Sequence, residues 1–178
     1  MKRTILLALL CSLLLPATAL AQKAAVVYFS ATGTTKAVAT RIASITEGKL
    51  YAITPATPYT SADLDWKDKQ SRSSIEMNDP KARPALKKSS VELKSCDIIF
   101  LGYPIWWNSA PRIINTFIES HDLKGKTIVP FATSGSSPIT ASVAALRKAY
   151  PDLKWESGRL LNDVSDKQLR EWLGKYGF

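Results

Sequence analysis

The chain has 178 residues, of which 46% are hydrophobic, and this is enough to bury one good core. Its formal net charge of +9 favours anionic partners or surfaces, but it carries no information about the fold. Two cysteines, Cys11 and Cys96, exclude a disulfide-rich scaffold, and the single histidine, His121, argues against a metal-dependent catalyst. We therefore expect one globular domain without a metal centre.

Residues 1–21 have the features of a secretory signal peptide. A Lys-Arg pair follows the initiator methionine, the apolar run Ile5–Leu15 comes next, and an Ala-Leu-Ala motif ends at Ala21. The run is shorter than the roughly 20 residues that span a bilayer. We predict cleavage before Gln22, no stable membrane anchor afterwards, a domain over residues 22–178, and a periplasmic or secreted location.

Short β-branched and aromatic runs alternate with longer helical patterns after this leader, as in a parallel sheet covered by helices on both faces. The expected strands are Ala24–Phe29, Lys49–Ile53, Asp97–Gly102, Thr127–Ala132 and a short one around Lys154–Glu156. The expected helices are Thr34–Ile45, about Ser61–Met77, about Pro111–Ser120, about Ile139–Ala149 and Ser165–Lys175. The fold class is α/β, with a doubly wound five-stranded parallel sheet.

The turn after the first strand, residues 30–36, reads Ser-Ala-Thr-Gly-Thr-Thr-Lys and leads directly into a helix. Such a turn aims backbone N–H groups and hydroxyls at one point beside the positive end of the helix dipole, which suits a phosphate monoester. It lacks the spacings of the nucleotide-triphosphate loop and of the dinucleotide fingerprint. Taken alone, the turn could equally be a simple helix cap.

Two further turns fall at the same end of the predicted sheet. Residues 102–108, after the third strand, read Gly-Tyr-Pro-Ile-Trp-Trp-Asn, and residues 133–137, after the fourth, read Thr-Ser-Gly-Ser-Ser. Adjacent tryptophans in a loop suit a flat aromatic ligand, although they could also fold back into the core. Ligands of doubly wound sheets bind beyond the carboxyl ends of the strands, so the three turns predict a pocket for a phosphorylated planar ring such as FMN.

These motifs resemble those of the flavodoxins, and the resemblance covers essentially all of the chain after residue 21. It implies a flavodoxin-like sheet in the order 2-1-3-4-5, in the short-chain form without an insertion that splits the fifth strand. It also implies FMN as the cofactor. Phosphate contact is implied for Ser30, Thr32, Gly33, Thr34 and Thr35. Contact with the isoalloxazine ring is implied for Pro104, Ile105, Trp106 and Trp107, with Thr133, Ser134, Gly135 and Ser136 as further candidates.

We expect an exported protein that binds FMN non-covalently and transfers electrons to and from redox partner proteins. No catalytic side chain is assigned, because the redox chemistry belongs to the flavin. Two alternatives stay open: an FMN-dependent NAD(P)H quinone or nitro reductase, and a flavin-free module that serves protein interactions. The basic stretch Lys81–Lys88 lacks the interleaved aromatics of a nucleic-acid surface, so no nucleic-acid partner is expected, and an acidic redox partner could dock there.

Overall fold

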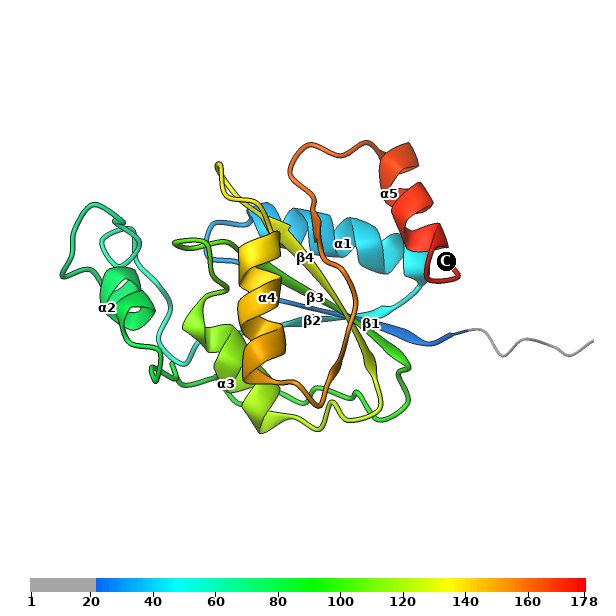
Figure 1. The fold of residues 1–178 in the computed structure, drawn as a ribbon, viewed down its shortest axis with the longest axis horizontal. Coiled ribbons are helices and arrows are strands. Elements are labelled where there is room, and N and C mark those ends of the chain that lie inside the picture. Colours follow the sequence, from blue (N-terminus) through cyan, green and yellow to red (C-terminus); the bar gives the residue numbers. More distant parts are fainter. Residues whose placement is uncertain (1–21) are drawn as a thin grey trace, which may run out of the picture.

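The computed structural model describes residues 22–178, so the predicted signal peptide and its cleavage site lie outside the described residues. These residues form one parallel sheet with helices on both faces (Figure 1). The strands are β1 (Ala24–Tyr28), β2 (Lys49–Ala52), β3 (Ile98–Pro104), β4 (Thr127–Thr133), β5 (Lys154–Trp155) and β6 (Arg159–Leu160). The helices are α1 (Thr34–Thr46), α2 (Arg72–Asn78), α3 (Arg112–Ser120), α4 (Thr140–Ala149) and α5 (Asp166–Gly174).

The strand order is β2-β1-β3-β4-β5, which confirms the predicted doubly wound topology. The register places Tyr28 beside Gly102 and Gly102 beside Phe131, and β3 and β4 run on together to the pair Pro104 and Thr133. Because all pairings are parallel, the turns after β1, β3 and β4 leave the sheet at one edge.

The central strands are buried on both faces, and their alternate residues build two separate cores. One core joins Ala25, Val27 and Phe29 of the β1 region to α3 and α4, and the other joins Val26 and Tyr28 to α1 and α5. This double burial explains why β1 and β3 read as unbroken apolar runs rather than as alternating patterns. Figure 1 shows α3 and α4 on one face and α1 with α5 on the other.

A glycine in β3 allows close packing of the second core. A Cβ atom added to Gly102 would lie 2.1 Å from the Cζ atom of Phe131, whose ring is completely buried. The absence of a side chain at this position therefore lets the Phe131 ring lie across β3.

The helix expected over about residues 61–77 is wrong over residues 61–71. Only residues 72–78 are helical, because three aspartates before them bond the backbone locally: Asp63 Oδ2 accepts from Thr60 N at 2.8 Å, and Asp65 and Asp68 accept from the amides two residues ahead at 3.0 and 2.8 Å. These turns compete with helical hydrogen bonds. As Figure 1 shows, α2 and its flanking turns extend outward from the sheet.

The fifth strand differs slightly from the expectation of one short segment. Both β5 and β6 pair with β4, and residues 156–158 interrupt them. Gly158 lies under α4, where an added Cβ would come within 2.7 Å of Ile139 Cδ1 and 2.9 Å of Val143 Cγ2. The interruption thus accommodates helix packing and is not a long insertion.

Candidate functional site

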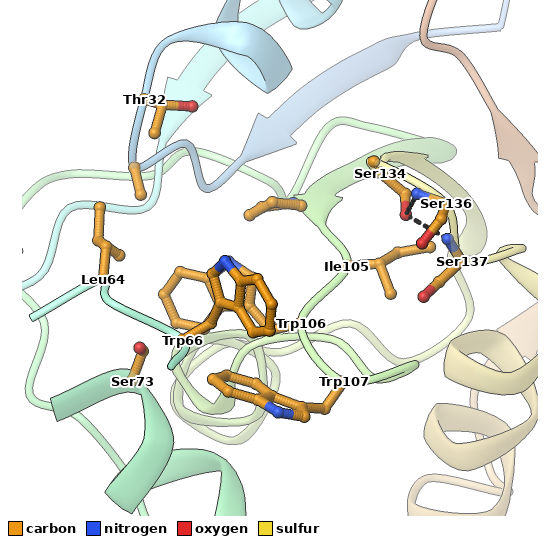
Figure 2. Close-up of a pocket in the computed structure, with 13 residues that line it drawn as sticks. Thr32, Leu64, Trp66, Ser73, Ile105, Trp106, Trp107, Ser134, Ser136 and Ser137 are labelled. Carbon is orange, nitrogen blue, oxygen red and sulfur yellow. Dashed lines mark hydrogen bonds between the residues drawn. The ribbon is translucent and has the colours of Figure 1, made fainter. Parts of the chain in front are cut away.

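A cavity of about 630 Å³ opens at the carboxyl edge of the sheet (Figure 2). The turns after β1, β3 and β4 converge on it, as predicted, and a fourth contribution comes from the segment that follows β2. The lining residues are Ala31, Thr32, Leu64, Trp66, Ser73, Pro104, Ile105, Trp106, Trp107, Ser134, Gly135, Ser136 and Ser137. None of these side chains carries a charge, so an occupant would be held by packing and by hydrogen bonds.

The turn after β1 leaves the start of α1 open to a ligand. Gly33 has φ +95° and serves as the N-cap residue, and within residues 22–178 no side chain caps this helix. Ser30 Oγ instead accepts a hydrogen bond from Gly33 N at 3.1 Å, which shapes the turn itself. The first-turn N–H groups of an uncapped helix are an anion site, so the geometry favours the ligand interpretation of this motif over the cap.

Two residues predicted to contact the cofactor bond each other through their hydroxyls. Thr35 Oγ1 and Thr133 Oγ1 lie 2.8 Å apart, and both residues are buried. This pair ties the first turn of α1 to the end of β4. The hydroxyls of Thr32 and Thr34 are exposed on the turn and lie 3.4 Å apart, within a long hydrogen bond of each other.

The aromatic loop after β3 contains a tight turn. Trp106 and Ser109 exchange backbone hydrogen bonds of 3.0 and 2.9 Å, and the two residues between them, Trp107 and Asn108, have φ values of +45° and +59°. Positive φ at both central positions defines a hairpin turn that asparagine tolerates and tryptophan rarely adopts. The turn leaves the Trp107 side chain 47% exposed at the cavity, and it therefore does not fold back into the core.

Trp106 is fixed by other aromatic rings. Its indole makes edge-to-face contacts with Phe29 and Tyr59, at centroid distances of 5.7 and 5.4 Å. Phe29 and Tyr59 also contact each other at 5.7 Å, so the three rings form a closed cluster. Trp106 thus combines the two alternatives left open by the sequence: it packs against the core and still lines the cavity.

A partly buried ion pair holds Tyr59 in that cluster. Tyr59 OH donates to Glu76 Oε2 at 2.5 Å, Arg72 Nε lies 2.7 Å from Glu76 Oε1, and the Arg72 guanidinium stacks 4.0 Å from the Tyr59 ring centroid. Burial, followed by the bond to Glu76, raises the pKa of Tyr59 far above its ordinary 10.0. Tyr59 consequently stays protonated and keeps donating at any physiological pH.

The serine turn after β4 is held by Asn162, a residue that the sequence analysis did not select. Asn162 Oδ1 accepts from Ser134 N at 2.8 Å, and Asn162 Nδ2 donates to Ser134 O. Ser134 Oγ in turn accepts from the amides of Ser136 and Ser137 at 3.2 and 2.8 Å. Figure 2 shows this turn on one side of the cavity and the labelled tryptophans on the other.

The residues nominated from sequence fall into two groups. Eight of them line the cavity: Thr32, Pro104, Ile105, Trp106, Trp107, Ser134, Gly135 and Ser136. The other nominated residues, Ser30, Gly33, Thr34, Thr35 and Thr133, build the turns behind or beside it. Five lining residues were not nominated: Ala31 and Ser137 lie within the predicted turns, and Leu64, Trp66 and Ser73 lie outside them. Trp66 stands out as a tryptophan in an otherwise polar stretch, the same signal that selected the loop after β3.

Across residues 22–178 no group of three or more His, Cys, Asp or Glu side chains could hold a metal ion. In this same range no helix is both long and apolar enough to cross a bilayer. Cys96 is buried at the start of β3, as expected for a small apolar side chain.

Similarity to other proteins agrees with the fold. A flavodoxin family profile matches residues 23–176. Two crystal structures described as flavoproteins, from Bacteroides eggerthii and Bacteroides uniformis, share 58% and 54% identity; they cover 88% and 86% of this chain and 98% of their own, with TM-scores of 0.84 and 0.83. A flavoprotein of Lactobacillus acidophilus crystallised with FMN has the same fold at 21% identity, covering 85% of this chain and 99% of its own, with a TM-score of 0.67. No curated protein matches the sequence. The chain belongs to the flavodoxin family.

Proposed function

We propose that this protein binds FMN non-covalently in the cavity at the carboxyl edge of the sheet and carries electrons with it. The observation that carries this proposal is that an aromatic wall and the turn leading into the uncapped start of α1, through Ala31 and Thr32, meet at one uncharged cavity. A phosphorylated planar ring needs these two features together, because its two ends differ so strongly in polarity. The flavoprotein relatives and the FMN-bound structure of similar fold support the same cofactor.

The residues present fit FMN part by part. The turn at residues 30–35 offers the exposed hydroxyls of Thr32 and Thr34 and the first N–H groups of α1 to the phosphate. Trp106, braced by Phe29 and Tyr59, offers an aromatic surface to the ring. The hydroxyls of Ser136 and Ser137 offer hydrogen bonds to the polar edge of a heterocycle, because Ser134 Oγ already bonds their amides and fixes the turn.

Bound FMN would supply one- and two-electron transfer, and the lining would supply its position and its shielding from water. The lining contains no carboxylate, imidazole, amine or thiol that could act as an acid, base or nucleophile. No Gly-x-Gly-x-x-Gly dinucleotide fingerprint occurs in the sequence, so we favour an electron carrier over an NAD(P)H-dependent reductase.

FMN titration, followed by quenching of flavin fluorescence, tests the proposal. We expect saturable quenching by the protein, and weaker binding by Trp106→Ala and Thr34→Ala. Thr40→Ala is the matched control for Thr34→Ala, because Thr40 is exposed on the same helix and its hydroxyl bonds only the carbonyl of Lys36, at 3.0 Å. No quenching by the unmodified protein would contradict FMN binding and leave the interaction-module alternative. Oxidation of NAD(P)H coupled to quinone reduction by the loaded protein would favour the reductase.

We further propose that the protein works outside the cytoplasm and receives FMN after export. The support is the leader over residues 1–21 and its Ala-Leu-Ala ending. Expression of the full chain, followed by cell fractionation and mass measurement, should give an exported protein that begins at Gln22. A cytoplasmic protein of full mass would contradict this.

Acidic redox proteins are the partners that we propose on grounds of charge. Lys81, Lys87 and Lys88 are exposed, whereas Arg83 between them is bonded to Glu119. Electron transfer to an acidic partner should slow as salt rises, because steering by exposed charges is screened. A rate that is independent of salt would contradict electrostatic docking.

A further inference from the structure

A tryptophan outside the three predicted turns lines the cavity. Trp66 belongs to the segment between β2 and α2, and its side chain is 68% exposed. The large hydrophobic residues that are exposed within residues 22–178 are Leu50, Trp66, Ile75 and Trp107. Two of these four, Trp66 and Trp107, line this one cavity. An exposed indole at a cavity mouth is a surface that a flat ligand can cover.

The backbone on both sides of Trp66 is anchored. Before it, Asp63 holds a turn through bonds of 2.8 Å from both Thr60 N and Thr60 Oγ1, and its carbonyl accepts from Ser73 N at 2.9 Å. After it, the carbonyl of Asp68 accepts from Ser74 Oγ at 2.7 Å. The turn is therefore attached to α2 at two points, and Trp66 is presented from a fixed frame.

The indole itself is lightly held. The aromatic interaction recorded for it is with Lys67, whose Nζ lies 5.6 Å from the ring centroid. Trp106, by contrast, is locked between Phe29 and Tyr59. The Trp66 ring is thus free to adjust to an occupant, while its backbone keeps it at the cavity.

The rest of the lining leaves room for this role. The turn after β4 contributes serines and a glycine, so it offers no aromatic surface. The loop after β3 contributes Trp106 and Trp107, both from one side. Among the lining residues, Trp66 is the aromatic side chain that comes from a different segment.

We propose that Trp66 is a second aromatic wall of the site, which packs on the isoalloxazine ring of bound FMN and screens it from water. The proposal rests on the FMN binding proposed above. Ligand binding would bury an indole that is otherwise exposed, so its contribution appears in affinity and in flavin accessibility, and not in the stability of the ligand-free protein.

The test compares Trp66→Ala with Ile75→Ala in protein purified after expression of the full chain. Ile75 is the matched control, because it is 53% exposed on α2 in the same segment and does not line the cavity. We expect Trp66→Ala to weaken FMN binding about tenfold and to release FMN faster. We also expect iodide to quench the residual fluorescence of the bound flavin more strongly. Trp66→Phe should recover part of the affinity, and ligand-free melting temperatures should agree among all variants.

The outcomes separate this inference from the proposed function. If the unmodified protein binds FMN and Trp66→Ala matches Ile75→Ala in affinity and in iodide quenching, the second wall is overturned and FMN binding stands. If the unmodified protein does not bind FMN, the proposed function itself fails, and this inference fails with it.

Discussion

Two regions of the molecule form the cavity, and different forces hold them. The turns after β1, β3 and β4 are fixed by the buried sheet, whose β1 residues are at most 7% exposed. The segment between β2 and β3, residues 53–97, has one short helix. It joins the core near its two ends, at Ile53, Leu93 and Cys96, and polar bonds such as the pair Arg72–Glu76 hold the part between them. Arg112 of α3 adds bonds of 3.3 and 2.9 Å to the carbonyls of Glu76 and Met77.

This difference separates folding from ligand preference. Changes at the sheet alter the cavity only by disturbing the main core, because the strands that carry the turns are themselves the core. Changes in residues 53–97 can alter the cavity wall while the sheet stays intact. We therefore expect selectivity among flat ligands to reside in this segment.

Gly102→Ala should have the largest effect, because it acts on the sheet. The new Cβ would lie 2.1 Å from Phe131 Cζ, and the ring of Phe131 is completely buried in the second core. Overpacking of this kind should lower the free energy of unfolding by about 2–3 kcal/mol. Urea denaturation of the ligand-free protein measures it.

Gly135→Ala is the control for that variant. No atom lies within 4 Å of a Cβ placed at Gly135, and its φ is not in the left-handed region. Its free energy of unfolding should differ from that of the unmodified protein by no more than about 0.5 kcal/mol. Equal denaturation midpoints for Gly102→Ala and Gly135→Ala would show that the Phe131 ring can move aside at little cost. The close packing of the sheet would then not fix the turns that form the site.

Glu76→Gln tests the other region. It weakens the bonds from Arg72 Nε and Tyr59 OH that hold the segment on the aromatic cluster, at a cost of about 2 kcal/mol for charge-assisted bonds in a half-buried site. Hydrogen exchange should speed up over residues 57–78 while β1 and β3 stay protected, because the loss is local.

The exposed Glu171→Gln on α5 is the control and should change neither region. If Glu76→Gln instead loosened the whole sheet, the two regions would form one cooperative unit, and the proposed separation would be wrong.

The sequence revealed the sheet region well and residues 53–97 poorly, for a physical reason. Burial on both faces turns β3 into a continuous apolar run, and parallel pairing then brings the turns to one edge whatever their side chains. The start of α2 depends on whether Asp63, Asp65 and Asp68 bond their own turns or leave the backbone to a helix, and apolar spacing does not distinguish these outcomes.

For the candidate site, too, local sequence patterns predict some features and miss others. The three turns were found from their positions after strands, and eight nominated residues line the cavity. The mutual bond of Thr35 and Thr133, 98 residues apart, and the bonds from Asn162 to Ser134 leave no trace in local pattern. Such contacts depend on the three-dimensional register between elements, which one sequence does not specify.

Thr133→Val should cost less than Glu76→Gln, about 1 kcal/mol, because it leaves the buried hydroxyl of Thr35 without its partner. The double variant Thr35→Val with Thr133→Val removes both hydroxyls at nearly constant shape, and it should be more stable than the sum of the single changes predicts. A double-mutant cycle from urea denaturation measures this coupling. Strict additivity would show that the pair does not join α1 to β4.

The smallest effect is expected at Arg83 and Glu119, where the polar segment meets α3. Arg83 Nε and Nη2 lie 2.7 and 2.8 Å from the two Glu119 oxygens, and Tyr150 OH donates to Oε1 at 2.7 Å. Both charged side chains are about a third or more exposed, so Glu119→Gln should cost only about 0.5 kcal/mol at neutral pH.

The pH dependence of this variant identifies the carboxylate charge as the cause. Hydrogen bonding from Arg83 lowers the pKa of Glu119 below its ordinary 4.5 in the folded protein. A lowered folded-state pKa gives stability above pH 4.5 that is lost as pH falls through the folded value. The gap in denaturation midpoint between the unmodified protein and Glu119→Gln should therefore close in acid and shrink in high salt. A gap that persists at low pH would assign the effect to packing and show that the segment is attached here without electrostatic help.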